Sequence, residues 1–118
     1  MIVVLEDSRA RFFRLENSGR LADGLPDIAS GIDGSTGLPA ERTEKRKRYL
    51  TAVMTAVEQA CEGNECDRLM AVGPERMLSA FRRAASDKVK VRLWREAAMN
   101  VRDATAAELE ARLAPHFR

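Results

Sequence analysis

The stretch from Arg42 to Cys61 reads RTEKRKRYLTAVMTAVEQAC, and it combines the strongest helix signal of the chain with its densest charge. From Tyr49 onward the apolar residues recur at helical spacing, at Tyr49, Leu50, Val53, Met54, Val57, Ala60 and Cys61. This periodicity predicts an amphipathic helix with one face in the core. Because Gly63-Asn64 is suitable for a left-handed helix end, we expect the helix to stop there.

Five cations and one carboxylate occupy the seven residues before this apolar stripe. The cations are Arg42, Lys45, Arg46, Lys47 and Arg48. The whole chain has a formal net charge of only +2, so the basic character is local. Cations at a helix N-terminus oppose the helix dipole, and helix stability therefore does not explain their position. We interpret the five residues as candidate nucleic-acid contacts, with RNA as the expected ligand. The alternative is a solvated helix surface.

A glycine-punctuated segment precedes the basic cluster. It predicts a flexible loop at about residues 29–41, in which Gly31, Gly34, Ser35, Thr36 and Gly37 give the backbone freedom. We expect this loop to supply flexibility beside the basic residues.

The rest of the chain predicts a mixed sheet of about five strands. Ile2–Leu5 is a continuous apolar run, typical of a central strand that is buried on both faces. Arg9–Leu15 follows a short turn and pairs antiparallel with it, and residues 20–28 form a short, irregular third strand. A buried strand is expected at residues 68–72. Residues 89–96 alternate apolar and charged side chains, which predicts an edge strand.

Two further helices are expected. One begins at Pro74, after the buried strand, and the other begins at Thr105, where Thr105 and Glu108 have the spacing of a capping box. Two strand-helix-strand passages require parallel pairing, whereas the opening hairpin is antiparallel. The order of elements therefore predicts an α/β fold with ribonuclease-H-like topology.

Length and composition limit the other possibilities. A chain of 118 residues with 45% apolar residues fits one domain, residues 1–118. Its apolar runs are too short for a membrane span or a signal peptide, so we expect a cytoplasmic protein with no membrane partner. Cys61 and Cys66 do not have the spacing of zinc ligands, and Cys61 belongs to the helix stripe. We expect no metal and no cofactor.

Three segments resemble a known family. They are IVVLEDSRARFF (Ile2–Phe13), DRLMAVGPERML (Asp67–Leu78) and AELEARL (Ala107–Leu113). They resemble the bacterial host-attachment protein family, which is similar to the middle domain of archaeal and eukaryotic peptide-chain release factors and of the ribosome-rescue factor Pelota. The resemblance covers most of the chain and implies a release-factor-like domain.

The resemblance also implies where function would lie. It places the release-factor Gly-Gly-Gln tip in the loop before the basic helix, where this chain has only Gly34-Ser35-Thr36-Gly37. Peptidyl-tRNA hydrolysis is therefore not expected, and we expect a non-catalytic protein that binds RNA or a ribosomal surface. A Lys-Asp-Leu-Thr-His block of family members falls on residues 99–103, where its Lys and Asp are absent.

Two alternatives stay open. The edge strand at residues 89–96 could serve a protein partner or a homodimer, and Trp94 within it could stack on a base or a partner, although we favour a tryptophan covered by a neighbouring helix. A metal-dependent nuclease would use Asp7 and Glu75, at the C-terminal ends of two strands. Their structural interpretation is that Asp7 caps the hairpin turn and Glu75 supports a helix start.

Overall fold

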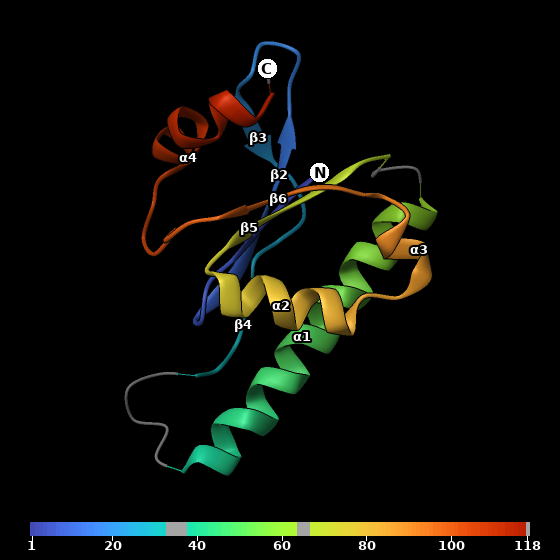
Figure 1. Cartoon of the computed structure of the whole chain (residues 1–118), viewed down its shortest axis with the longest axis vertical. Helices are drawn as coiled ribbons and strands as arrows, with labels where there is room; N and C mark the ends of the chain where they lie inside the picture. The colour runs from blue at the N-terminus through green and yellow to red at the C-terminus, as the bar shows by residue number, and fades with distance from the viewer. Residues whose placement is uncertain (33–37, 64–66, 118) are drawn as a thin grey trace.

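The structure is a computed structural model that describes residues 1–32, 38–63 and 67–117 (Figure 1). Its strands are β1 (Ile2–Leu5), β2 (Arg9–Leu15), β3 (Leu21–Asp23), β4 (Ile28–Ala29), β5 (Leu69–Gly73) and β6 (Leu93–Ala98). Its helices are α1 (Pro39–Glu62), α2 (Glu75–Ala84), α3 (Asp87–Lys90) and α4 (Ala106–Leu113), followed by a 3-10 turn at Ala114–Phe117.

The sheet is mixed, as the sequence predicts. Its order is β3-β2-β1-β5-β6, and β4 pairs with β2 as well. The pairs β1–β2 and β2–β3 are antiparallel, whereas β1–β5 and β5–β6 are parallel. These pairings confirm the mixed α/β fold class. The ribonuclease-H-like topology stays a prediction.

Two apolar cores lie on the two faces of the sheet. On one face, the stripe of α1 packs with Met77, Leu78 and Phe81 of α2 against Val3, Leu5 and Phe12. On the other face, Leu109 and Leu113 of α4 pack against Ile2, Val4, Phe13, Met70 and Val72. Figure 1 shows α1, α2 and α3 on one side of the sheet and α4 on the other. All four residues of β1 are buried, which confirms it as the central strand.

The predicted strand at residues 89–96 is wrong in its first half. Residues 87–90 form α3, and the backbone N–H groups of Val89 and Lys90 both donate to the Ser86 carbonyl. Val89 reaches the core from this helical turn, while Val91 is 79% exposed, so the two valines do not share a strand face. The strand begins only at Leu93. Its edge position is confirmed, because β6 ends the strand order.

Other boundaries also differ. Residues 20–28 contain β3 and the start of β4 in place of one strand, because Gly24-Leu25-Pro26 interrupts the extended structure. Helix α1 ends at Glu62, next to the predicted Gly63-Asn64 stop; Gly63 has φ −83° and is not left-handed, and Asn64 lies outside the described residues. Pro74 is the residue before α2 and not its first residue.

The basic cluster lies within α1, which begins at Pro39. The loop before it is consequently shorter than the predicted 29–41, since residue 29 ends β4. Of the predicted loop residues, Gly34, Ser35, Thr36 and Gly37 lie outside the described residues, as does Cys66. Cys61 is buried on the helix stripe, as predicted. Within the described residues, none of the helices has both the length and the apolar character needed to cross a bilayer.

Candidate functional site

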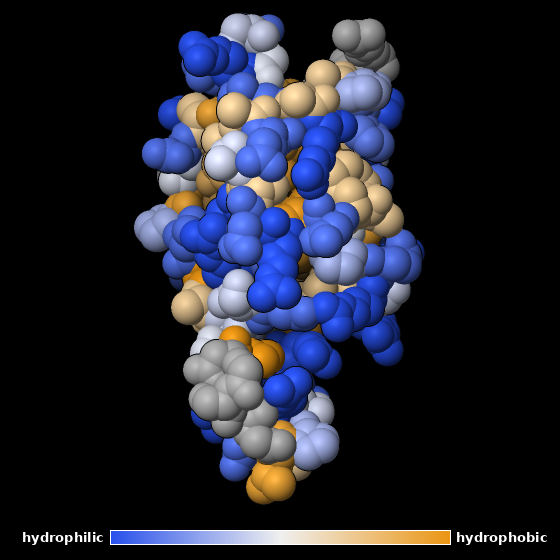
Figure 2. All heavy atoms as spheres, turned by 90° about the vertical axis from the view of Figure 1, so that its left-hand side faces the viewer, coloured by the Kyte–Doolittle hydropathy of each residue, from blue (hydrophilic) through white to orange (hydrophobic). Residues whose placement is uncertain are grey.

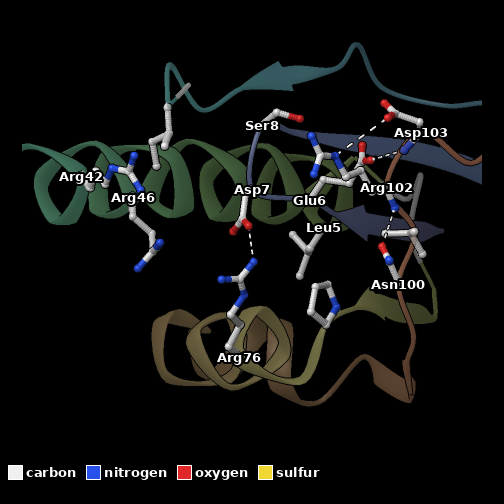
Figure 3. Close-up of a pocket in the computed structure, with 13 residues that line it drawn as sticks. Leu5, Glu6, Asp7, Ser8, Arg42, Arg46, Arg76, Asn100, Arg102 and Asp103 are labelled. Atoms are coloured by element: carbon white, nitrogen blue, oxygen red, sulfur yellow. Dashed lines mark hydrogen bonds and ion pairs between the residues drawn. The ribbon is translucent and has the colours of Figure 1, made fainter. Parts of the chain in front are cut away.

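A cleft of about 850 Å³ opens at the C-terminal edge of the parallel strands β1, β5 and β6 (Figure 3). Its walls are the turn after β1, the N-terminal turns of α1, the start of α2 and the loop after β6. Ligands of α/β sheets usually bind at this edge of the strands. Figure 2 views the molecule from the left-hand side of Figure 1, the side that this strand edge faces, and the surface there is predominantly hydrophilic. The cleft is therefore the candidate functional site, and it suits a polar ligand.

Arg42 and Arg46 of α1 line this cleft because they continue the buried face of the helix. They are four residues apart, and Arg46 precedes the buried residues Tyr49 and Leu50 by three and four residues. Residues at these spacings lie on one side of a helix. Figure 1 shows the N-terminal turns of α1 projecting past the sheet. The same face of α1 is thus apolar where the helix covers the sheet, and it carries Arg42 and Arg46 in the N-terminal turns that project past the sheet.

The structure separates the other three predicted cations from the cleft. The Lys45 ammonium donates to the Gly31 carbonyl at 3.1 Å, and Gly31 has φ +72°, a conformation that favours glycine. Arg48 pairs with Glu44 of the preceding turn at 3.7 Å. Lys47 is exposed, and neither it nor Arg48 lines the cleft. Only two of the five predicted contacts therefore converge on one site.

Arg76 and Asp7 form an ion pair inside the cleft, between the guanidinium group and Oδ2 (Figure 3). The other carboxylate oxygen of Asp7, Oδ1, is enclosed and has no hydrogen-bond partner among the described residues. Arg76 belongs to the first turn of α2, so the positive end of that helix dipole also lies here. Asp7 compensates only part of this positive charge.

A buried polar contact holds the wall opposite α1, which is the loop after β6. Glu6 is 5% exposed, and its carboxylate lies 3.5 Å from the Arg11 guanidinium and accepts the N–H of Asp103 at 2.9 Å. Arg11 is 7% exposed and donates to the carbonyl oxygens of Val101, at 3.2 Å, and of Ala104. Charged groups at such burial need partners, and the loop backbone supplies them. The loop position thus depends on Glu6 and Arg11.

Tyr49 connects α1 to the same region. Its hydroxyl donates to the backbone carbonyl of Glu6 at 2.9 Å. Burial, followed by the nearby Glu6 charge, raises the pKa of Tyr49 far above its ordinary value, so the phenol stays neutral. The side chain of Tyr49 therefore fixes α1 against the end of β1, one turn after Arg46.

Sequence reasoning missed Arg76, Arg102 and Arg11 as contributors to the site. Arg102 lines the cleft from the loop after β6. Arg76 follows β5 at the same strand edge as Asp7. Ligands of α/β sheets bind at the C-terminal ends of the strands, and searching this edge for cations as well as carboxylates would have found Arg76. No local sequence signal distinguishes Arg11 from an exposed strand residue.

The two carboxylates considered for a nuclease each face an arginine of α2. Asp7 pairs with Arg76, and Glu75 pairs with Arg82 at 2.8 Å. Across the described ranges, no three His, Cys, Asp or Glu side chains come together as a metal-ligand set. In the described residues each carboxylate thus has an arginine as its charged partner, and the metal-dependent nuclease stays a prediction.

Trp94 lies at the opposite, N-terminal edge of the parallel strands. It is 41% exposed, and the Arg68 and Arg95 guanidinium groups lie 5.7 and 4.7 Å from its ring centroid. The expectation that a helix covers Trp94 is therefore wrong. The reason is a register shift between β5 and β6, which leaves Trp94 as the extra residue of a bulge, and bulges at sheet edges redirect side chains.

The family model for bacterial archaeo-eukaryotic release factor family 10 matches residues 1–118. The chain belongs to this family. The match confirms the release-factor relationship that the three sequence segments predict. No curated protein matches the chain.

One wall of the cleft coincides with a block that the resemblance singles out. The block that the resemblance places at residues 99–103 forms the loop after β6, and Asn100 to Asp103 line the cleft of this family 10 chain. The segment on which the resemblance places the release-factor tip, Gly34 to Gly37, lies outside the described residues.

Proposed function

We propose that this protein binds RNA or a ribosomal surface, without catalysing a reaction, through the cleft and the projecting turns of α1. The observation that carries the proposal is the convergence of Arg42 and Arg46 with Arg76 and Arg102 in one cleft. Guanidinium groups match phosphate oxygens with two parallel hydrogen bonds, and they are less strongly hydrated than ammonium groups. Nucleic acid presents such phosphates along its whole length.

Three further points support the proposal. Membership of a release-factor family suggests a ribosomal context. The hydrophilic surface on the side that the strand edge faces is unsuited to an apolar partner (Figure 2). The chain lacks the Gly-Gly-Gln sequence, so the non-catalytic part of the proposal rests on its sequence. A ribosomal partner also implies a cytoplasmic location, which belongs to the same proposal.

The test is co-sedimentation with ribosomes over a series of salt concentrations. Binding through phosphate contacts should weaken as salt rises, with a log-log slope of about −0.7 to −0.9 for each phosphate neutralised. The Arg42→Glu/Arg46→Glu variant should lose binding. The matched control, Lys47→Glu/Arg48→Glu, reverses the same charge on the same helix away from the cleft and should retain most of it.

Two outcomes would reject this proposal. One is the absence of co-sedimentation by the wild type even at low salt. The other is an equal loss in both double variants, which would indicate diffuse attraction to α1 and no role for the cleft. Circular dichroism of each variant checks that α1 is still folded.

A second candidate function is a protein contact or a homodimer through β6. It is favoured by one observation, that β6 is an edge strand whose outer side pairs with no other described strand. The bulge at Trp94 interrupts the first part of this edge, which weakens it as a template for strand addition. A monomeric mass in light scattering at high protein concentration would exclude the homodimer.

A further inference from the structure

The Asp7–Arg76 pair has a feature that an ordinary surface ion pair lacks. Its carboxylate lies inside a cleft lined by three other arginines, and its second oxygen is enclosed without a hydrogen-bond partner in the described part of the chain. A buried acceptor without a partner costs free energy. Asp7 therefore contacts Arg76 without satisfying its own hydrogen-bonding capacity.

Arg46 supplies the second arm of the same site. Its side chain lines the cleft from α1 and has no ion pair or hydrogen bond with any described residue. In Figure 3, Arg46 and Arg76 extend from α1 and α2 into the space between the two helices, and Asp7 lies beside Arg76. One guanidinium group is thus compensated by Asp7, and another faces the same space without a carboxylate from the described residues beside it.

We propose that the cleft is a phosphate-binding site, in which Arg46 and Arg76 hold the anion and Asp7 is a competing carboxylate that the phosphate displaces from Arg76. A phosphate group offers more acceptor oxygens and more negative charge than a carboxylate, and so it can engage both guanidinium groups. The start of α2 adds the positive end of a helix dipole. The side chain of Asp7 is 43% exposed, so it can turn toward solvent when displaced.

This inference rests on the proposed RNA binding for its biological ligand, and it deepens that proposal by naming the group that is recognised and the residue that opposes it. The phosphate can come from the end of an RNA strand or from its backbone. Both sources present the same oxyanion chemistry to the cleft. The cleft itself is bounded by α1, α2, the turn after β1 and the loop after β6.

The first test is titration of the full chain with inorganic phosphate at constant ionic strength, followed by calorimetry and by the NMR signals of the arginine side chains. The Arg76 signal should shift with phosphate and not with chloride. Arg76→Gln should weaken phosphate binding about tenfold or more, because it removes charge-assisted hydrogen bonds. Arg83→Gln, on the same helix and outside the cleft, should bind like the wild type.

The competing role of Asp7 is tested by a pair of matched variants. Asp7→Asn should tighten phosphate binding about two- to fivefold, the size expected when an exposed ion pair no longer competes. Asp103→Asn removes the same charge from the rim of the same cleft but does not touch Arg76, and it should change the affinity less than twofold.

RNA oligonucleotides with a 5′-phosphate and with a 5′-hydroxyl then separate the two sources. Tighter binding of the 5′-phosphate form identifies a strand end, and equal binding identifies backbone phosphate. The inference is overturned if neither wild type nor Asp7→Asn binds phosphate, if Arg76→Gln binds normally, or if Asp103→Asn tightens binding as much as Asp7→Asn. Ribosome binding that persists without phosphate binding would overturn this inference alone, whereas phosphate binding without ribosome or RNA binding would overturn only the proposed function.

Discussion

The carboxylate of Glu6 accepts the backbone N–H of Asp103 at 2.9 Å, although the two residues are 97 positions apart in the chain. The contact joins the end of β1 to the loop after β6. Both segments line the cleft, so its width depends on a hydrogen bond that is itself partly buried. The stability of the fold and the shape of the site are therefore coupled at Glu6.

Replacing Glu6 with alanine should destabilise the protein by about 3–5 kcal/mol, because Arg11 would stay buried without its carboxylate. Urea denaturation measures the loss, and faster hydrogen exchange at the Asp103 amide should accompany it. Asp27→Ala, which breaks an exposed pair with Arg9, is the control and should cost about 0–1 kcal/mol. Similar losses in the two variants would show that the Glu6–Arg11 contact is not a structural element.

The α3 turn gives a second prediction, from two neighbouring valines. Val89 is fully buried and Val91 is 79% exposed, so Val89→Ala should cost about 2 kcal/mol and Val91→Ala less than about 0.5 kcal/mol. Thermal or urea unfolding of both variants measures the two losses in the free energy of unfolding. If residues 89–96 were one strand with both valines on its inner face, the two substitutions would have comparable effects.

Gly73 at the end of β5 should not accept a side chain. A Cβ atom there would lie 2.6 Å from the Leu5 carbonyl oxygen on the neighbouring strand, so Gly73→Ala should cost about 1–3 kcal/mol through displaced backbone. At Gly63, a Cβ atom would meet its nearest atom, the Gln59 carbonyl oxygen, at 3.4 Å, and φ is −83°. Gly63→Ala should therefore be neutral or stabilising by about 0.4–1 kcal/mol. A reversed order in urea unfolding would refute the strand contact.

Tyr49 should make the protein sensitive to alkali. Burial raises the pKa of the folded phenol above the value of about 10 in the unfolded chain, so the folded state holds this proton more tightly. The corresponding stability is fully present below pH 10 and is lost as the pH rises further. Tyr49 is the only tyrosine of the chain, so tyrosinate absorbance should appear together with unfolding.

Tyr49→Phe is the matched variant for this alkaline transition. It loses the hydrogen bond to the Glu6 carbonyl, at a cost of about 1 kcal/mol at neutral pH, and its stability should fall less steeply above pH 10. Tyrosinate absorbance that rises in the wild type near pH 10, before any loss of helix signal, would contradict the burial of this hydroxyl.

Local patterns predicted the elements that depend on local spacing. The stripe from Tyr49 to Cys61 is buried as predicted, because helical periodicity needs no information from the rest of the chain. The same holds for Thr105, whose hydroxyl accepts the N–H of Glu108 at 3.1 Å. The alternation at Val89 misled the prediction, because two valines at i and i+2 fit a strand and also a short helical turn that continues into an exposed residue.

The cleft depends on contacts that no window of sequence contains. Arg76 pairs with Asp7, which lies 69 positions earlier in the chain. Arg11 is covered by the loop after β6, whose Val101 carbonyl accepts its hydrogen bond. The basic cluster was recognised by its charge alone, and charge density does not show which side of a helix faces a cleft. The structure was needed to separate Arg42 and Arg46 from Lys45, Lys47 and Arg48.

Arg42 and Arg46 share a helix face with the core stripe. The packing of that stripe fixes the rotation of α1 about its own axis, and it therefore also fixes the direction in which the two arginines point. One residue inserted between Arg46 and Tyr49 would turn the arginines by about 100° away from the cleft and leave every core contact in place. Four inserted residues would return them to within about 40° of their present direction, one turn farther out. The distance from the arginines to the first buried residue, counted in helical turns, therefore decides whether basic residues of α1 reach the cleft, and the number of basic residues does not.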